Sequence, residues 1–179
     1  MSSSILQVPK LHVEIVKVKF SEGNIKSLLS KLSARCKNTF LQLINEESYY
    51  SKSQVTLAYV LTQKAFKEGY NRLKKPPLEF LLYLSATTQF NKAIEKVGIG
   101  EKNVACLIII SDDRAATTKC LNSIRSEVEV LGECTPGEEY IKKLYEIDDR
   151  MLEEQCFQRE RRKCLEVLVL ESISSIDYV

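Results

Sequence analysis

Residues 104–110 read VACLIII, the longest run of apolar residues in the chain. Its β-branched side chains favour a strand, and an apolar run without polar interruption is typical of a strand buried on both faces. The run is far shorter than the roughly 20 residues that span a bilayer. We therefore predict a fully buried strand here and interpret the rest of the chain outward from it.

The residues after this run predict a β-α-β unit. Ser111-Asp112-Asp113 leads into a helix over residues 115–124, and a carboxylate suits the positive end of a helix dipole. Residues 127–131 then alternate as a second strand, with Val128 and Val130 on one face.

A similar unit is predicted near the N-terminus. Residues 11–20 alternate as a strand with a shift of frame that indicates a bulge, and residues 39–44 read TFLQLI. Between them, apolar residues recur at helical spacing at Ile25, Leu28 and Leu32. Two such halves can combine into one small sheet with helices on a face, as in split β-α-β folds. The predicted fold class is therefore mixed α/β (α+β).

Residues 48–100 separate the two halves and read as a helical insert. Ser53 is a candidate N-cap for a helix that ends near Gly69. Pro76-Pro77 stands at the entry to the apolar run 78–84, and this favours a helix over a strand because proline is tolerated in a first helical turn.

The remaining segments are also predicted to be helical. Thr88 is expected to cap a helix that Gly98 ends, and residues 138–147 form another. A final helix is predicted over about residues 148–172. With 179 residues and no internal repeat, the chain is interpreted as a single domain over 1–179.

Composition leaves the class of partner open. The chain has 26 basic and 24 acidic residues, and a net charge of +2 is too small to argue for nucleic acid by itself. Met1 to Val8 lacks the basic start and long apolar run of a signal peptide. We therefore expect a protein that is neither secreted nor embedded in a membrane.

The cysteines are interpreted as buried or incidental reduced thiols, in preference to metal ligands or disulfides. Zinc sites place pairs of ligands two to four residues apart, and no C-x-x-C spacing occurs in this chain. The six residues are Cys36, Cys106, Cys120, Cys134, Cys156 and Cys164.

Catalytic machinery is not recognisable. His12 is the only histidine, so most histidine-based acid–base schemes are excluded. Gly98-Ile99-Gly100 precedes a strand, whereas a phosphate cradle opens a helix. Helix capping explains both Asp112-Asp113 and Asp148-Asp149. We expect a non-catalytic protein that needs no cofactor and no metal, and that acts by binding other macromolecules.

Two features suggest partner-binding surfaces. Between Lys52 and Lys75 the insert has six basic residues and one acid, Glu68, and this is either a phosphate-binding patch or a solvated helix face. Residues 164–170 are apolar nearly all round, interrupted by Glu166. Because a terminal helix packed on one side should keep a polar face, this helix is either covered by a partner or buried in the protein's own core.

The order of these motifs resembles the PRPK-binding protein family, the kinase-binding small subunit of the KEOPS/EKC complex. The resemblance rests on residues 78–110 (LEFLLYLSATTQFNKAIEKVGIGEKNVACLIII), 139–147 (EYIKKLYEI) and 54–66 (QVTLAYVLTQKAF). Pro76-Pro77 departs from the family's Thr/Ser-rich entry to the apolar run, and residues 159–163 are more basic than the family pattern.

The resemblance implies a non-enzymatic subunit that binds the N-terminal lobe of a small atypical kinase/ATPase through its C-terminal region and activates it. That assembly, which includes a threonylcarbamoyltransferase subunit, makes threonylcarbamoyladenosine at position 37 of tRNAs reading codons that start with adenine. The subunit would be nuclear and cytoplasmic, with links to telomeres and transcription. A free-standing RNA-binding module that uses the insert is the alternative.

Carried over residue by residue, the resemblance assigns two sets of site residues. The kinase-facing residues would be Leu165, Leu168, Val169 and Ile173, and the tRNA-facing residues would be Lys64, Lys67, Arg72, Lys74 and Lys75.

Overall fold

Strand β3 (Val104–Ser111) lies inside a four-stranded sheet of order β2-β3-β1-β4. The computed structural model describes residues 10–21, 25–156 and 160–178. Every neighbouring pair of strands is antiparallel, and the other strands are β1 (His12–Lys19), β2 (Phe40–Ile44) and β4 (Glu129–Glu133).

This strand order confirms the predicted split β-α-β arrangement. Since β3 is antiparallel to both β1 and β2, the first two strands are parallel with β3 inserted between them. By the same reasoning β3 and β4 are parallel, with β1 between them. The expected bulge is present in the pairing of β1 with β4, but its extra residue is Leu131 on β4, because Lys17 pairs with Gly132 and Val18 with Val130.

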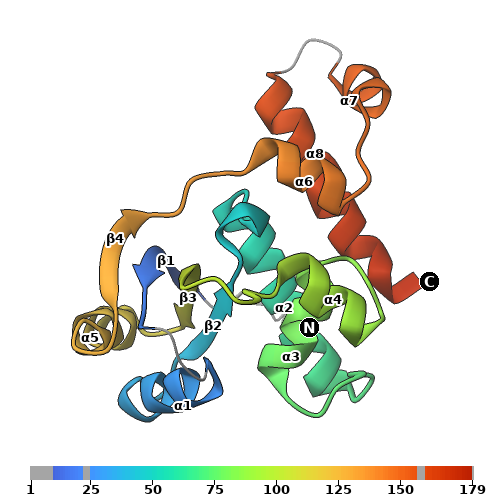
Figure 1. Cartoon of the computed structure of the whole chain (residues 1–179). Coiled ribbons are helices and arrows are strands. Elements are labelled where there is room, and N and C mark those ends of the chain that lie inside the picture. The colour runs from blue at the N-terminus through green and yellow to red at the C-terminus, as the bar shows by residue number, and fades with distance from the viewer. Residues whose placement is uncertain (1–9, 22–24, 157–159, 179) are drawn as a thin grey trace.

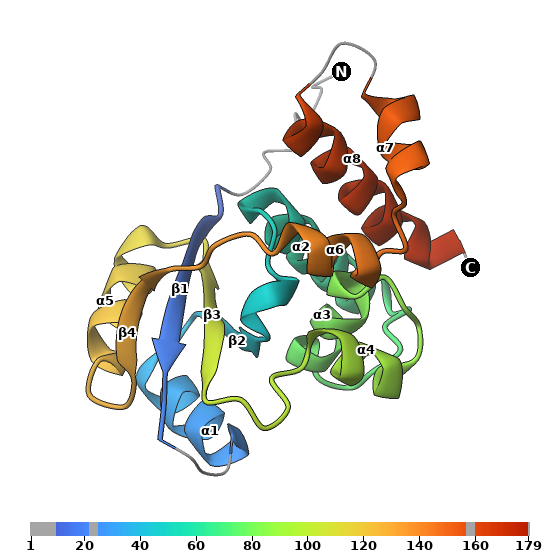
Figure 2. The same cartoon turned by 45° about the horizontal axis from the view of Figure 1, so that its top comes forward.

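The two faces of the sheet are covered by different parts of the chain (Figures 1 and 2). Helices α1 (Ile25–Arg35) and α5 (Arg114–Ile124) pack on the face that includes Leu107 and Ile109. The helical part of the chain packs on the face that includes Ile108 and Ile110. Both faces of β3 are therefore buried, as its apolar run predicted.

The insert forms α2 (Lys52–Glu68), α3 (Pro76–Leu84) and α4 (Phe90–Val97). Gly69 closes α2 with a left-handed φ of 78°, and proline occupies the first turn of α3, as predicted. The Ser53 cap was wrong: Ser51 accepts the hydrogen bond from the Gln54 N–H, and Ser53 lies exposed within the helix.

The Thr88 cap was also wrong, since Gln89 is the N-cap residue of α4 and makes no side-chain capping bond. Thr87 provides the local support, because its hydroxyl accepts a hydrogen bond from the Gln89 N–H. Gly98 ends the helix as expected, with its N–H bonded to the Ile94 carbonyl.

The C-terminal region contains α6 (Glu138–Leu144), α7 (Asp149–Gln155) and α8 (Arg161–Ser174), followed by a short 3-10 turn at Ser175–Tyr178. Another 3-10 turn, η1 (Glu46–Ser48), lies between β2 and α2. The single helix predicted over 148–172 was wrong. Asp148 caps α7 by accepting from the Met151 N–H, and α7 is capped at its end by Cys156. Glu160 then has extended backbone, which prevents one continuous helix. Residue 159 of the predicted basic run lies outside the described residues.

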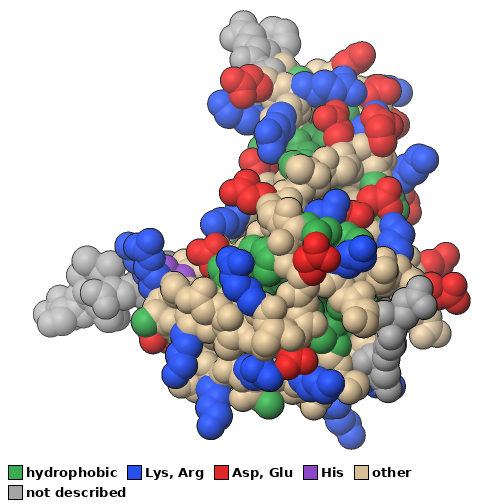
Figure 3. Space-filling view, turned by 60° about the vertical axis from the view of Figure 1, so that its left-hand side comes forward, with side chains coloured by type: hydrophobic (Ala, Val, Ile, Leu, Met, Phe, Trp, Pro, Cys, Tyr) green, Lys and Arg blue, Asp and Glu red, His purple; other side chains and the backbone are tan. Residues whose placement is uncertain are grey.

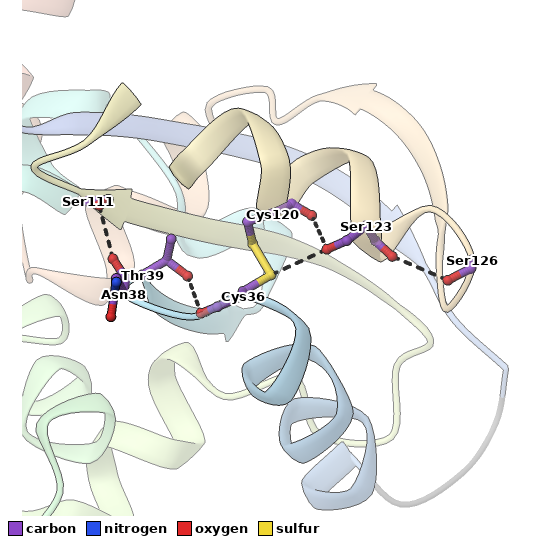
Figure 4. Close-up of a disulfide and its surroundings, with 7 residues drawn as sticks. All are labelled: Cys36, Asn38, Thr39, Ser111, Cys120, Ser123 and Ser126. Carbon is purple, nitrogen blue, oxygen red and sulfur yellow. Dashed lines mark hydrogen bonds between the residues drawn. A yellow bond between two sulfur atoms is a disulfide. The ribbon is translucent and has the colours of Figure 1, made fainter. Parts of the chain in front are cut away.

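The interpretation of the cysteines as reduced thiols was wrong for this structure. Three disulfides join residues that are 84, 28 and 8 positions apart, with Cα–Cα distances of 4.7, 6.0 and 5.5 Å. Spacing along the chain could not reveal these pairs, because folding brings distant elements together. Figure 4 shows the bond between the end of α1 and α5. In chain order the pairs are Cys36–Cys120, Cys106–Cys134 and Cys156–Cys164.

Among the described residues, no helix is both long and apolar enough to cross a bilayer.

Candidate partner-binding surfaces

The inner face of α8 consists of the residues that were expected to face a kinase. Their exposed fractions are 7% or less, and they belong to the main hydrophobic core together with residues of α2 and α3. In the chain alone these side chains are covered by its own core, and their contact with a kinase stays a prediction. The residues are Leu165, Leu168, Val169 and Ile173.

The position of α8 explains why these side chains are buried. They recur at helical spacing on the stripe that packs against α2 and α3. The start of the helix is tied to the end of the η1 segment, because the Tyr50 hydroxyl donates a 2.9 Å hydrogen bond to the Arg162 carbonyl. Of the two interpretations of the apolar terminal helix, burial in the protein's own core therefore describes this stripe.

The outer face of α8 still has apolar side chains. Val167 and Leu170 are half-buried, while Glu171 and Ser174 on the same side of the helix are exposed. Four positions spaced i, i+3, i+4 and i+7 lie on one face of a helix. The outer face of α8, defined as Val167, Leu170, Glu171 and Ser174, is therefore partly apolar and open to solvent.

A groove of about 840 Å³ adjoins this face, between α8 and the C-terminal half of α2. Leu61, Lys64 and Tyr70 line one side of it, and Glu171 and Ser174 line the other. An apolar strip beside a groove with charges of both signs suits a protein surface better than a small apolar ligand.

Arg72 was expected to face tRNA, but the structure places it in an intramolecular network. Its guanidinium donates to the Asp177 carboxylate at 3.2 Å and to the Ile176 carbonyl at 3.1 Å. Partial burial alone would lower the pKa of Arg72, but hydrogen bonding to Asp177 and Tyr83 raises it above its usual value. Arg72 therefore fastens the C-terminal turn to the insert, and its assignment to tRNA stays a prediction.

Tyr83 belongs to the same network. Its hydroxyl donates a 2.8 Å hydrogen bond to Asp177. Burial and the charge of Asp177 both raise the pKa of this phenol above its usual range. The tyrosine therefore stays protonated and available as a donor.

The other four residues assigned to tRNA are exposed. Lys64 and Lys67 lie on α2, and Lys74 and Lys75 lie in the segment before α3. Within the described part of the chain, none of the four forms an ion pair. They could meet phosphates, and they could equally be a solvated helix face.

The carboxylate pairs cap helices, as predicted. Asp113 accepts a 2.8 Å hydrogen bond from the Ala115 N–H at the start of α5, and Asp148 accepts one from the Met151 N–H. Among the residues that the structure describes, no group of three or more His, Cys, Asp or Glu could hold a metal ion.

A second cavity, of about 650 Å³, lies where β2 and β3 meet α2 and α3. Phe40, Tyr59 and Pro77 form apolar parts of its wall, and Asn38 and Asp112 contribute polar side chains to the lining. Burial is the main cause that raises the pKa of Tyr59, and the charge of Asp112 adds to it. Sequence reasoning did not find this cavity, because its walls come from segments far apart in the chain.

Comparison with known protein families gives one match. The family model described as kinase binding protein CGI-121 matches residues 18–177. No curated protein matches the chain. The matched range includes all of α1 to α8 and the strands β2, β3 and β4, whereas most of β1 precedes it.

Proposed function

The chain belongs to the CGI-121 family of kinase-binding proteins, and we propose that it is the non-catalytic subunit that binds and activates the small atypical kinase/ATPase of the KEOPS/EKC complex. The observation that carries this proposal is the family match over residues 18–177. It agrees with the resemblance found in the apolar run, the strand and the terminal helix.

The kinase would contact the outer face of α8. This face has the half-buried side chains Val167 and Leu170. Covering them with a partner would stabilise the complex by about 25 cal/mol for each Å² of apolar surface removed from water. The inward residues would support the interface indirectly by fixing the helix on the core. This proposal keeps the C-terminal region as the binding element and changes which side chains make the contact.

Through that kinase the chain would join the threonylcarbamoyltransferase subunit and support threonylcarbamoyladenosine formation at position 37 of tRNA. Exposed lysines on the insert, Lys64, Lys67, Lys74 and Lys75, are available to phosphates. We place the subunit in the nucleus and cytoplasm, and its roles would extend to telomeres and transcription.

Reconstitution tests the proposal. The purified chain is mixed with the small kinase/ATPase, and complex formation and ATP hydrolysis are measured. We expect a stable complex, faster hydrolysis by the kinase, and no hydrolysis by the chain alone. No complex by size-exclusion chromatography at micromolar concentration, together with unchanged hydrolysis, would contradict the kinase-subunit proposal.

A free-standing RNA-binding module is the second candidate, because the lysines of the insert are exposed. It predicts salt-sensitive tRNA binding by the chain alone, lost when Lys64, Lys67 and Lys74 are reversed to Glu. Tight tRNA binding without any kinase complex would favour this candidate over the adaptor.

A further inference from the structure

The two helices on the outer side of the sheet have charges of one sign. Residues 25–38, which include α1, and residues 114–126, which include α5, contain no acidic residue, although the whole chain has 24. With a net charge of only +2, the protein therefore concentrates positive charge on this layer. We call these basic residues the α1–α5 face: Lys26, Lys31, Arg35, Lys37, Arg114, Lys119 and Arg125.

Both helices lie in one layer, so these charges share one side of the molecule. α1 and α5 pack on the same apolar cluster of the sheet, through Leu28, Leu32, Cys120 and Ile124. All seven basic residues are exposed. In the view of Figure 3, which brings the sheet side forward, Lys and Arg predominate over the lower part, whereas acidic and basic side chains intermix over the upper part.

Few of these charges are neutralised within the protein. Arg35 forms an ion pair with Glu127 at 2.6 Å. In the described ranges, no ion pair is formed by Lys31, Lys37 or Lys119. The like charges of Lys31, Lys37 and Lys119 repel one another, and a polyanion that covers them would relieve the repulsion.

The uncharged side chains on the face indicate which polyanion fits. Hydroxyl and amide groups stand between the charges, and such groups donate hydrogen bonds to phosphate oxygens. Among the described residues, the large hydrophobic side chains that are exposed lie on α2, α4, β4, α7 and the segment after α2, and none lies on α1 or α5. A bilayer surface or an apolar protein interface would require such side chains. The uncharged polar residues are Ser27, Ser30, Ser33, Thr118 and Asn122.

The spacing of the two helices is fixed. The Cys36–Cys120 disulfide joins the residue after α1 to the middle of α5, with its Cα atoms 4.7 Å apart. Figure 4 shows this bond, with Ser123 of the same helix beside the Cys36 sulfur. A rigid array of charges suits a rigid, regularly spaced ligand such as the phosphates of a duplex.

We infer that the α1–α5 face binds the phosphate backbone of a base-paired arm of a folded RNA, as a surface separate from the lysines of the insert. The inference rests on the RNA-binding part of the proposed function and not on the kinase. Without exposed aromatic side chains on this face, the contact reads shape and charge and not base sequence.

Fluorescence anisotropy of a labelled tRNA transcript with the full-length chain tests this inference. The double variant Lys31→Glu/Lys119→Glu changes the face, and Lys64→Glu/Lys67→Glu on α2 is the matched control with the same change in charge. We expect the first variant to weaken binding at least roughly tenfold, and to lower the slope of log affinity against log salt by about 2. Circular dichroism should be unchanged in both variants, and kinase binding should be unchanged in the α1–α5 variant.

Each result has a distinct meaning. If the control weakens binding and the α1–α5 variant does not, the inference is overturned, while RNA binding by the insert stands. If the wild-type chain does not bind tRNA at low salt, the inference and the RNA part of the proposed function both fail, and kinase binding is judged separately. Equal or tighter binding to anionic phospholipid vesicles than to tRNA would also overturn it.

Discussion

Glu79 is fully buried and accepts a 3.0 Å hydrogen bond from the backbone N–H of Arg72. The same carboxylate oxygen accepts a 2.7 Å bond from the Leu73 N–H. The other oxygen lies 3.8 Å from the Arg72 guanidinium, which also binds Asp177. One carboxylate thus holds the segment that carries Lys74 and Lys75, and through Arg72 it reaches the end of the chain.

Replacing Glu79 by Ala should therefore lower the free energy of unfolding by about 2–4 kcal/mol. The change leaves two backbone donors without an acceptor and removes the partner of a partly buried cation. Urea denaturation followed by circular dichroism measures the loss. Glu79→Gln keeps one acceptor oxygen and should cost less than Glu79→Ala; equal costs would show that the hydrogen bonds do not stabilise the segment.

Stability should fall in alkaline solution partly through Tyr145. Its buried hydroxyl bonds to the Leu84 carbonyl and the Gln54 amide, and burial raises the pKa of the phenol far above its usual value near 10. Because the pKa is raised in the folded state, the protonated phenol contributes its full stabilisation below about pH 10. This contribution is lost as the pH rises further, where Tyr145 ionises in the unfolded chain and not in the folded one.

The variant Tyr145→Phe should be less stable at pH 7, by about 1–3 kcal/mol, because two polar groups lose their partner. Its unfolding free energy should also depend less on pH between about pH 9 and pH 11 than that of the wild type. Parallel slopes for the two proteins over this range would exclude Tyr145 as a source of the alkaline loss.

The two sides of α8 should respond differently to substitution. Leu165 is completely buried, so Leu165→Ala should lower the free energy of unfolding by about 2–5 kcal/mol. Leu170 lies on the outer face, and Leu170→Ala should cost less than about 1 kcal/mol. Thermal unfolding compares them, and a larger loss at Leu170 would reverse the inside and outside of the helix.

The Cys36–Cys120 bond closes a long loop, because the two residues are 84 positions apart in the sequence. Since cross-linking distant residues restricts the unfolded chain, Cys36→Ser/Cys120→Ser should cost about 3–4 kcal/mol in protein purified without reductant. Adding dithiothreitol should lower the urea midpoint of the wild type by more than that of the variant, because the variant already lacks this bond. Alkylation of both cysteines in the native, unreduced protein would contradict the bond.

Periodicity and composition predicted the sheet well. The apolar run at 104–110 predicted a strand covered on both faces, and the two β-α-β halves predicted one small sheet. The order β2-β3-β1-β4 could not be predicted from the sequence. Helix ends were less predictable. Serine caps helices well at either position 51 or position 53, and the preceding turn η1 determines that α2 begins after Ser51. No sequence signal marked the end of α7 at Cys156 or the extended backbone of Glu160 before α8.

The candidate sites were predictable only in part. Apolar character identified α8 as an unusual helix, but it could not distinguish the buried Leu168 from the half-buried Leu170, since both are leucines. The basic cluster in the sequence included Arg72, but the sequence did not indicate that Arg72 pairs with Asp177, because the two residues are far apart in the chain. Both distinctions depend on tertiary packing.

We propose that the outer face of α8 binds the small kinase. Isothermal titration calorimetry of the kinase with wild-type chain, Leu170→Asp and Ile94→Asp tests this proposal, because Ile94 is an exposed apolar residue on a different helix, α4. We expect at least a roughly tenfold weaker Kd for Leu170→Asp, corresponding to about 1.4 kcal/mol, and an unchanged Kd for Ile94→Asp. Unchanged binding by a folded Leu170→Asp, or an equal loss in both variants, would contradict the claim.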